Sequence, residues 1–80
     1  MSVLTLYGRS YCHLCDDMRD ALLPLISGLE IELREVDVDS DPELVERFDE
    51  LVPVLMAGDV ELCHYFLDEA RVRAYLEEIR

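Results

Sequence analysis

A chain of 80 residues makes one domain, spanning residues 1–80, and its 51% hydrophobic content is ample for a single thin core. Nineteen acidic residues stand against seven arginines, with no lysine, and the net charge of −12 leaves no basic stripe to bind nucleic acid. No apolar run approaches the roughly 20 residues that cross a membrane, and no basic segment precedes an apolar export signal, so we expect a protein of the reducing cytoplasm.

The first predicted element is a buried strand over residues 3–7, which is apolar and β-branched and ends at Gly8. Cys12 and Cys15 follow with a C-x-x-C spacing, at the start of a helical repeat of apolar residues. The two cysteines therefore lie where a strand is followed by a helix, with Cys12 in or near the first turn. The apolar positions of this predicted helix are Met18, Ala21, Leu22, Leu25, Ile26 and Leu29.

This position predicts different roles for the two thiols. The unpaired N–H groups and the positive dipole end of a helix stabilise an anion, so we expect Cys12 to be the nucleophilic thiolate. Cys15 falls three residues later, toward the buried face, and we expect it to be the resolving thiol. A C-x-x-C disulfide closes too small a loop to be an effective structural cross-link, and its natural use is reversible exchange.

The middle of the chain predicts the end of this helix, a second strand and a short second helix. Pro24 predicts a kink or an early end near Leu23. Residues 29–39 alternate between apolar and charged side chains, with a phase shift that predicts either a bulge near Glu35 or partial burial of both faces. Ser40 begins a Ser-Asp-Pro-Glu capping box, which predicts a helix whose buried side is formed by Leu44, Val45 and Phe48.

The last third of the chain predicts a hairpin and a final helix. Pro53 favours an extended Val52, and residues 54–56 are expected to form the third strand. An Ala-Gly-Asp turn then returns the chain as a fourth strand over residues 60–65. Asp68 is placed to cap a last helix whose buried stripe is Val72, Tyr75, Leu76 and Ile79.

The predicted order, β-α-β-α-β-β-α, defines an α/β fold. It combines a right-handed parallel β-α-β unit with a hairpin, in a four-stranded mixed sheet with helices on both faces. The chain resembles the thioredoxin superfamily over nearly its whole length, and glutaredoxins most closely. The resemblance rests on this order of elements, on Cys12-His13-Leu14-Cys15 after the first strand and on Val52-Pro53 before the third. The pattern is similar to that of a small glutaredoxin-like family. The resemblance implies a thioredoxin-like fold in which a cis Pro53 lies against the dithiol and the backbone of Val52 pairs with bound substrate.

The resemblance also implies how a substrate is held. Arg9 stands where glutaredoxins carry a lysine that meets a carboxylate of glutathione, and its other interpretation is a solvated turn arginine. We expect Tyr11 to lie half-exposed beside the dithiol, either shielding a mixed disulfide or simply packing. His13 and Leu14 replace the usual Pro-Tyr, and a protonated His13 would stabilise the Cys12 thiolate, whereas a solvated loop histidine would not. The Gly-Gly turn with which glutaredoxins hold the other end of glutathione is missing after the fourth strand.

Metal binding is the alternative use of the cysteines. The residue types that bind zinc occur at Cys12, Cys15, Cys63 and His64, although adjacent strand residues point to opposite faces. The resemblance implies a second kind of metal site, an iron–sulfur cluster that bridges two subunits, which some glutaredoxins assemble with glutathione. Without such a metal, Cys63 is expected to share a strand face with Glu61 and Tyr65 and to be a semi-buried, inert thiol.

We therefore predict a cytoplasmic, glutaredoxin-like thiol–disulfide oxidoreductase, a redox-active electron-transport protein that reduces protein disulfides or glutathione mixed disulfides. Cys12 forms the mixed disulfide and Cys15 resolves it, and glutathione as co-substrate or a reductase restores the dithiol. We expect a monomer with no tightly bound cofactor and no resident metal. The alternative is a non-catalytic binding module or a metal carrier that uses the same cysteines.

Overall fold

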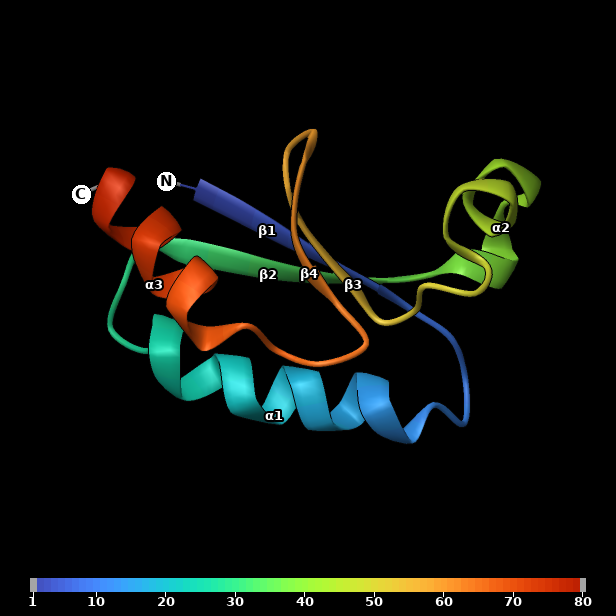
Figure 1. Ribbon diagram of the computed structural model, residues 1–80, viewed down its shortest axis with the longest axis horizontal. Helices are drawn as coiled ribbons and strands as arrows, with labels where there is room; N and C mark the ends of the chain where they lie inside the picture. The colour runs from blue at the N-terminus through green and yellow to red at the C-terminus, as the bar shows by residue number, and fades with distance from the viewer. Residues whose placement is uncertain (1, 80) are drawn as a thin grey trace.

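The computed structural model describes residues 2–79, and its elements follow the predicted order β-α-β-α-β-β-α (Figure 1). A short 3₁₀ turn, η1, is the addition to that order, between the second strand and the second helix. The bounds are β1 Ser2–Gly8, α1 His13–Ile26, β2 Ile31–Asp37, η1 Val38–Ser40, α2 Pro42–Phe48, β3 Val54–Ala57, β4 Val60–His64 and α3 Glu69–Glu78.

The four strands form one mixed sheet in the order β2-β1-β3-β4. β1 and β2 are parallel and stay in unbroken register from Ser2 opposite Ile31 to Gly8 opposite Asp37. The bulge predicted near Glu35 is therefore wrong, and the alternative, partial burial along β2, is what the strand shows. β3 runs antiparallel to both β1 and β4, which confirms the C-terminal hairpin.

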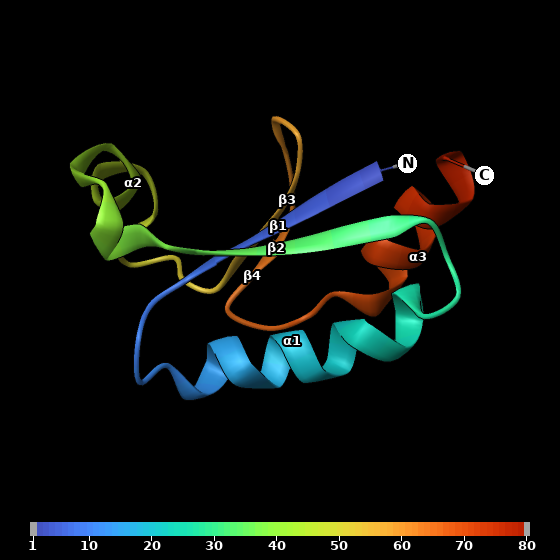
Figure 2. The same ribbon diagram turned by 180° about the vertical axis from the view of Figure 1, so that it is seen from behind.

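Helices cover both faces of this sheet, as predicted. Figures 1 and 2 show α1 running along one face with α3 beside it, while α2 lies near the far end of β2. Because successive side chains of a strand point to opposite faces, β3 divides its residues between two cores. Leu55 belongs to the core under α1 and α3, whereas Val54 and Met56 join Phe48 in the core under α2.

Helix α1 continues past Pro24, so of the two expected effects of this proline, a kink or an early end, the early end is wrong. Pro24 lies on the exposed side of α1, and the helix runs on to Ile26. Leu22 and Ile26, on the buried side, pack into the larger core and hold the last turn in place, so packing outweighs the lost backbone hydrogen bond. Gly28, at a φ of 80°, then turns the chain, and Leu29 lies outside the helix and is 47% exposed.

The cap of α2 lies one residue later than the sequence indicated. Asp41 is the N-cap, and its carboxylate accepts a hydrogen bond from the backbone N–H of Glu43 at 2.9 Å. The predicted cap, Ser40, belongs to η1 instead and donates its hydroxyl to the carbonyl of Asp37 at 2.6 Å. The cause is Val38, which is fully buried and draws the chain into a turn before the helix begins.

The hairpin contains an irregularity that the sequence pattern did not indicate. The pairing of β3 with β4 shifts between Leu55 and Met56, and as a result Leu62 and Cys63 both lie in the larger core. The prediction that Cys63 shares a strand face with Glu61 is therefore wrong, because strict alternation does not hold across a bulge. Tyr65, the third residue predicted on that face, lies beyond the end of β4.

The chain after β4 follows the prediction more closely. Asp68 caps α3 as predicted, accepting a hydrogen bond from the backbone N–H of Arg71 at 3.0 Å. Val72 and Leu76 form the buried side of that helix, whereas Ile79 lies beyond its end and is 40% exposed. Among residues 2–79, no helix combines the length and apolar character needed to span a bilayer.

Candidate active site

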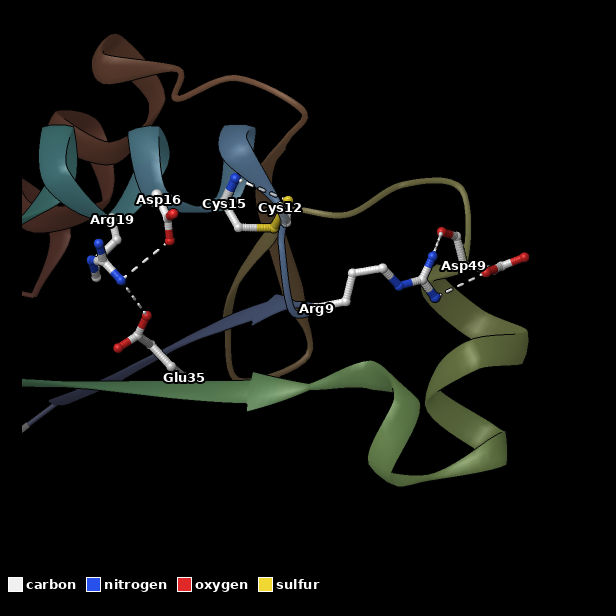
Figure 3. The surroundings of a disulfide bond; sticks show 7 residues. All are labelled: Arg9, Cys12, Cys15, Asp16, Arg19, Glu35 and Asp49. Carbon is white, nitrogen blue, oxygen red and sulfur yellow. Dashed lines mark hydrogen bonds and ion pairs between the residues drawn. A yellow bond between two sulfur atoms is a disulfide. The ribbon is translucent and has the colours of Figure 1, made fainter.

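Two cysteines form a disulfide at the junction between β1 and α1 (Figure 3). Cys12 is the N-cap of α1, and its Sγ accepts a hydrogen bond from the backbone N–H of Cys15 at 3.1 Å. The Cα atoms of the two residues are 5.2 Å apart, as the first turn of a helix places them. A sulfur that accepts from an otherwise unpaired helix N–H is in the position where a negative charge is stabilised once the disulfide is reduced.

The two cysteines differ in exposure in the predicted direction. Cys15 is 8% exposed and lies on the same helical face as the buried Met18 and Leu22. Cys12, at the cap, is only partly buried. An external disulfide therefore has access to Cys12 before Cys15.

Gly8 is a site residue that the sequence analysis treated only as the end of a strand. A Cβ added at Gly8 would lie 2.8 Å from the Sγ of Cys15 and 3.2 Å from its Cβ. Real Cβ atoms do not approach sulfur so closely, so only glycine leaves room for the disulfide at this position. The only indication in the sequence was a glycine four residues before the C-x-x-C stretch. Its role became visible once the packing of α1 on β1 placed Cys15 next to it.

Arg9 has protein carboxylates as its partners. Its guanidinium forms ion pairs with Asp49 at 3.0 Å and Asp39 at 3.1 Å and also donates to the carbonyl of Asp49 at 3.4 Å. The hydrogen bond with Asp49 is the main reason that the pKa of Arg9 is raised, and the charge of Asp39 adds to it. Figure 3 shows the side chain pointing away from the disulfide toward Asp49. Arg9 thus ties the loop after β1 to η1 and the end of α2, and its role toward a substrate carboxylate stays a prediction.

The residues on either side of Cys12 face solvent. Tyr11 is fully exposed and has a φ of 57°, so the expectation that it is half-exposed is wrong. This left-handed conformation directs the ring away from the protein, and it is uncommon for an aromatic residue. His13 occupies the first position of α1 and is also exposed. Both side chains are open to an approaching substrate, which leaves their binding role a prediction.

The peptide bond between Val52 and Pro53 is cis, as the resemblance implied. Pro53 is fully buried, and its carbonyl accepts a hydrogen bond from the backbone N–H of Tyr65 at 2.9 Å. Val52 is half-buried against the core under α2. The contact of Pro53 with the dithiol and the pairing of Val52 with substrate stay predictions.

A pocket of about 330 Å³ opens beside Cys15, between α1 and the end of the β1–β2 pair. Arg19 lies next to it and bridges Asp16 at 3.4 Å and Glu35 at 3.5 Å (Figure 3). A hydrogen bond to Asp20 is the main reason that the pKa of Arg19 is raised. The lining residues are Leu6, Gly8, Arg9, Ser10, Cys15, Asp16, Glu35, Val36 and Asp37.

The sequence analysis did not connect the acidic residues of β2 with the dithiol. The parallel register places Asp37 opposite Gly8, and this brings Glu35 and Asp37, which are distant from Cys15 in the chain, to the same pocket. A local sequence pattern cannot predict this contact, because the contact forms only when β1 and β2, which are joined through α1, pair in the sheet.

The zinc-ligand types in the sequence do not form a ligand set in the part of the chain that the structure describes. Within residues 2–79, no group of three or more histidine, cysteine or acidic side chains is arranged to hold a metal ion. Cys63 is 8% exposed inside the larger core, and His64 contacts Glu61 at 3.0 Å on the surface.

Comparisons with known proteins agree with this geometry. The sequence profile of the Glutaredoxin-like domain (DUF836) matches residues 3–77, whereas no curated protein matches the chain. The solution NMR structure of protein Ne2328 from Nitrosomonas europaea is 41% identical and has a TM-score of 0.83, over 92% of this chain and 89% of that one. The X-ray structure of target protein XcR50 from X. campestris is 37% identical, with a TM-score of 0.74 over 94% and 96% of the two chains. A buckwheat glutaredoxin–glutathione complex, 13% identical with a TM-score of 0.53 over 94% of this chain and 68% of that one, shares the fold.

Proposed function

This chain belongs to the family of the glutaredoxin-like domain (DUF836), and from that premise we propose that it is a thiol–disulfide oxidoreductase. The observation that carries the proposal is the Cys12–Cys15 disulfide at the start of α1, with the more exposed cysteine at the helix cap. A dithiol in this position fits a thiol redox role, because the helix end favours the thiolate of one cysteine and the other lies within reach of it.

The proposed reaction is a two-step exchange. The Cys12 thiolate attacks one sulfur of a substrate disulfide, the substrate S–S bond breaks, and one substrate thiolate leaves. The Cys15 thiolate then attacks the Sγ of Cys12, releases the second substrate thiol and forms the Cys12–Cys15 disulfide. Two electrons pass from the dithiol to the substrate, and a second pair, from two glutathione molecules or from a reductase, restores the dithiol.

The exposed residues around Cys12 are proposed to contact the substrate. Tyr11 and His13 flank the attacking sulfur, and the backbone of Val52 before the cis Pro53 is the proposed pairing edge. The proposed substrates are protein disulfides or glutathione mixed disulfides in the cytoplasm, acted on by a monomer without a tightly bound cofactor.

An equilibrium redox titration tests the proposal. The protein is equilibrated at defined ratios of reduced to oxidised glutathione, its thiols are trapped, and mass spectrometry counts the free thiols and any glutathione adduct. We expect a two-electron transition of Cys12 and Cys15 between about −270 and −180 mV, the range from thioredoxin to disulfide isomerase. If no disulfide forms at any ratio, the proposed redox couple does not exist.

Matched cysteine variants assign the roles. Cys12→Ser is expected to abolish turnover of a small disulfide substrate with a thiol reductant, whereas Cys15→Ser is expected to accumulate a mixed disulfide on Cys12. Cys63→Ser is the matched control, because this thiol lies in the core and takes no part in the proposed exchange. Turnover that persists in Cys12→Ser would exclude the proposed mechanism.

A further inference from the structure

The pocket beside the disulfide collects carboxylates from two elements. Asp16 comes from the first turn of α1, and Glu35 and Asp37 come from β2. We propose that the dithiol acts preferentially on disulfides flanked by positively charged groups, and that anionic disulfides such as oxidised glutathione are disfavoured. This inference rests on the proposed oxidoreductase function and narrows its substrates: of the two classes proposed above, it favours protein disulfides with basic neighbours over glutathione mixed disulfides.

The cation that lines the pocket does not offset these carboxylates. Arg9 contributes to the wall, but its guanidinium points away from the disulfide and is shared between Asp39 and Asp49 (Figure 3). One positive charge against two negative charges leaves that group negative. A substrate carboxylate would have to displace two protein carboxylates to reach Arg9.

The second nearby cation is outnumbered as well. Arg19 forms ion pairs with Asp16, Asp20 and Glu35, so one guanidinium faces three carboxylates. Asp37 adds a further negative charge, and its carboxylate accepts a hydrogen bond from the backbone N–H of Asp39 at 2.9 Å. The surroundings of the pocket are therefore negative even after every ion pair is counted.

This field acts on the dithiol because Cys15, which is disulfide-bonded to Cys12, lines the same small pocket as the carboxylates. A volume of about 330 Å³ is at the lower end for a small-molecule site, so its walls lie within about one Debye length, roughly 8 Å at physiological ionic strength. A negative field of this kind raises the local concentration of cationic reactants and lowers that of anionic ones. Glutathione carries two carboxylates against one ammonium, so it falls in the disfavoured class.

A series of three small disulfides tests the preference. Cystamine, bis(2-hydroxyethyl) disulfide and 3,3′-dithiodipropionate share a two-carbon arm and end in an ammonium, a hydroxyl and a carboxylate. The rate of oxidation of the reduced protein by each is divided by the rate of the same disulfide with 2-mercaptoethanol, which removes differences in intrinsic reactivity. At about 0.01 M ionic strength, we expect normalised cystamine to react at least about tenfold faster than the dicarboxylate, with the hydroxyl compound between them. In 1 M NaCl the ratio is expected to fall to within about twofold, because the Debye length is then about 3 Å.

Two double variants with the same loss of charge locate the effect. Glu35→Gln with Asp37→Asn removes two charges at the pocket, and Glu30→Gln with Asp59→Asn removes two from exposed positions outside it. We expect the pocket variant to reduce the cystamine preference at least about threefold and the remote variant to reduce it less. Equal reductions by both variants would overturn the assignment to the pocket, and a preference for the dicarboxylate, or none, would overturn the proposal. Failure to react with any of the three disulfides would instead count against the oxidoreductase function itself.

A second set of substrates, disulfide-linked peptides, distinguishes a basic protein segment from a small aminothiol disulfide as the source of the positive charge. Disulfide-linked peptides with lysines or with glutamates beside the cysteine are compared in the same way. A lysine-to-glutamate ratio larger than that of the small compounds identifies a basic protein segment as the substrate. An equal or smaller ratio identifies a small aminothiol disulfide.

Discussion

At the level of single residues, Gly8 decides whether the disulfide fits between β1 and α1. The Sγ of Cys15 occupies the space that any side chain at this position would need. Because Cys15 is also held in the core by its helix, neither partner can move away without a cost.

Gly8→Ala is therefore predicted to destabilise the oxidised protein by about 1–3 kcal/mol, the usual range for overpacking. After reduction, Cys15 can turn to another rotamer, so the reduced protein should lose less stability. The potential of the couple should then become less negative, by about 30 mV for each 1.4 kcal/mol of difference. Urea unfolding of both redox forms and a glutathione titration measure these quantities.

Gly28→Ala is the matched control. Gly28 has a φ of 80° but nothing lies within 4 Å of its missing Cβ, so alanine there strains the backbone without touching the disulfide. We expect a loss of stability with an unchanged redox potential. A potential that shifts equally in both variants would contradict the steric role of Gly8.

The raised pKa of Cys63 leads us to expect that the free energy of unfolding declines at alkaline pH. Burial raises its pKa, the charges of Asp68 and Glu61 act in the same direction, and a backbone hydrogen bond at Asp68 opposes them. Above about pH 8.5, the ordinary pKa of a cysteine, the unfolded chain therefore binds fewer protons than the folded one, and the free energy of unfolding falls as pH rises.

In Cys63→Ala this part of the decline is expected to disappear. Urea unfolding of the oxidised protein at pH 7, 8.5 and 9.5 measures it, with the Cys12–Cys15 pair held as a disulfide so that it does not titrate. Parallel pH profiles for the variant and the original chain would show that Cys63 is not responsible.

At the level of elements, each of the helices α1, α2 and α3 begins at a side chain that caps it. Cys12 caps α1 with a sulfur, Asp41 caps α2 and Asp68 caps α3. Each cap satisfies an N–H group that the helix leaves without an internal partner. The same geometry that orders a helix start thus fixes the position of the Cys12 sulfur.

Asp68→Ala is predicted to lower the free energy of unfolding by about 1 kcal/mol, within the 0.5–2 kcal/mol range for lost caps. For a domain of this size, that corresponds to a fall in Tm of roughly 4–8 °C. Asp68→Asn keeps the hydrogen-bond acceptor for the backbone N–H of Arg71 and should retain most of the stability. If asparagine is as damaging as alanine, the cap is not what stabilises α3.

At the level of the whole molecule, the charge of −12 works against the compact state. The ion pairs of Arg9 and Arg19 are at the surface and offset little of this repulsion. The molecule is therefore expected to depend on ionic strength in both stability and reactivity.

Raising NaCl from about 0.01 to 0.3 M is predicted to increase Tm by a few degrees, because the Debye length shortens and the carboxylates are screened from one another. KCl at the same ionic strength should give the same increase, since screening does not depend on the identity of the cation. A Tm that falls with salt would show that the surface ion pairs outweigh the repulsion.

The errors of prediction have local causes that can be named. Pro24 was expected to kink α1 or to end it near Leu23, and the early end is wrong because core packing on the opposite face carries the helix to Ile26. Ser40 was expected to cap α2, but the burial of Val38 shifts the start by one residue. Cys63 was expected to share a strand face with Glu61, but a pairing shift in the hairpin brings it into the core. Each rule was sound for an isolated segment, and a tertiary contact outweighed it.

The sequence by itself determined the features that depend on spacing along the chain. These are the order of the elements, the dithiol at a helix start, the inward position of Cys15 and the cap at Asp68. Only the tertiary structure decided which side chains surround that dithiol. The carboxylate partners of Arg9 and the approach of Glu35 to the pocket depend on strand register and on packing between segments distant in sequence. Local propensity carries no information about such contacts, since they exist only once the parallel β-α-β unit has closed.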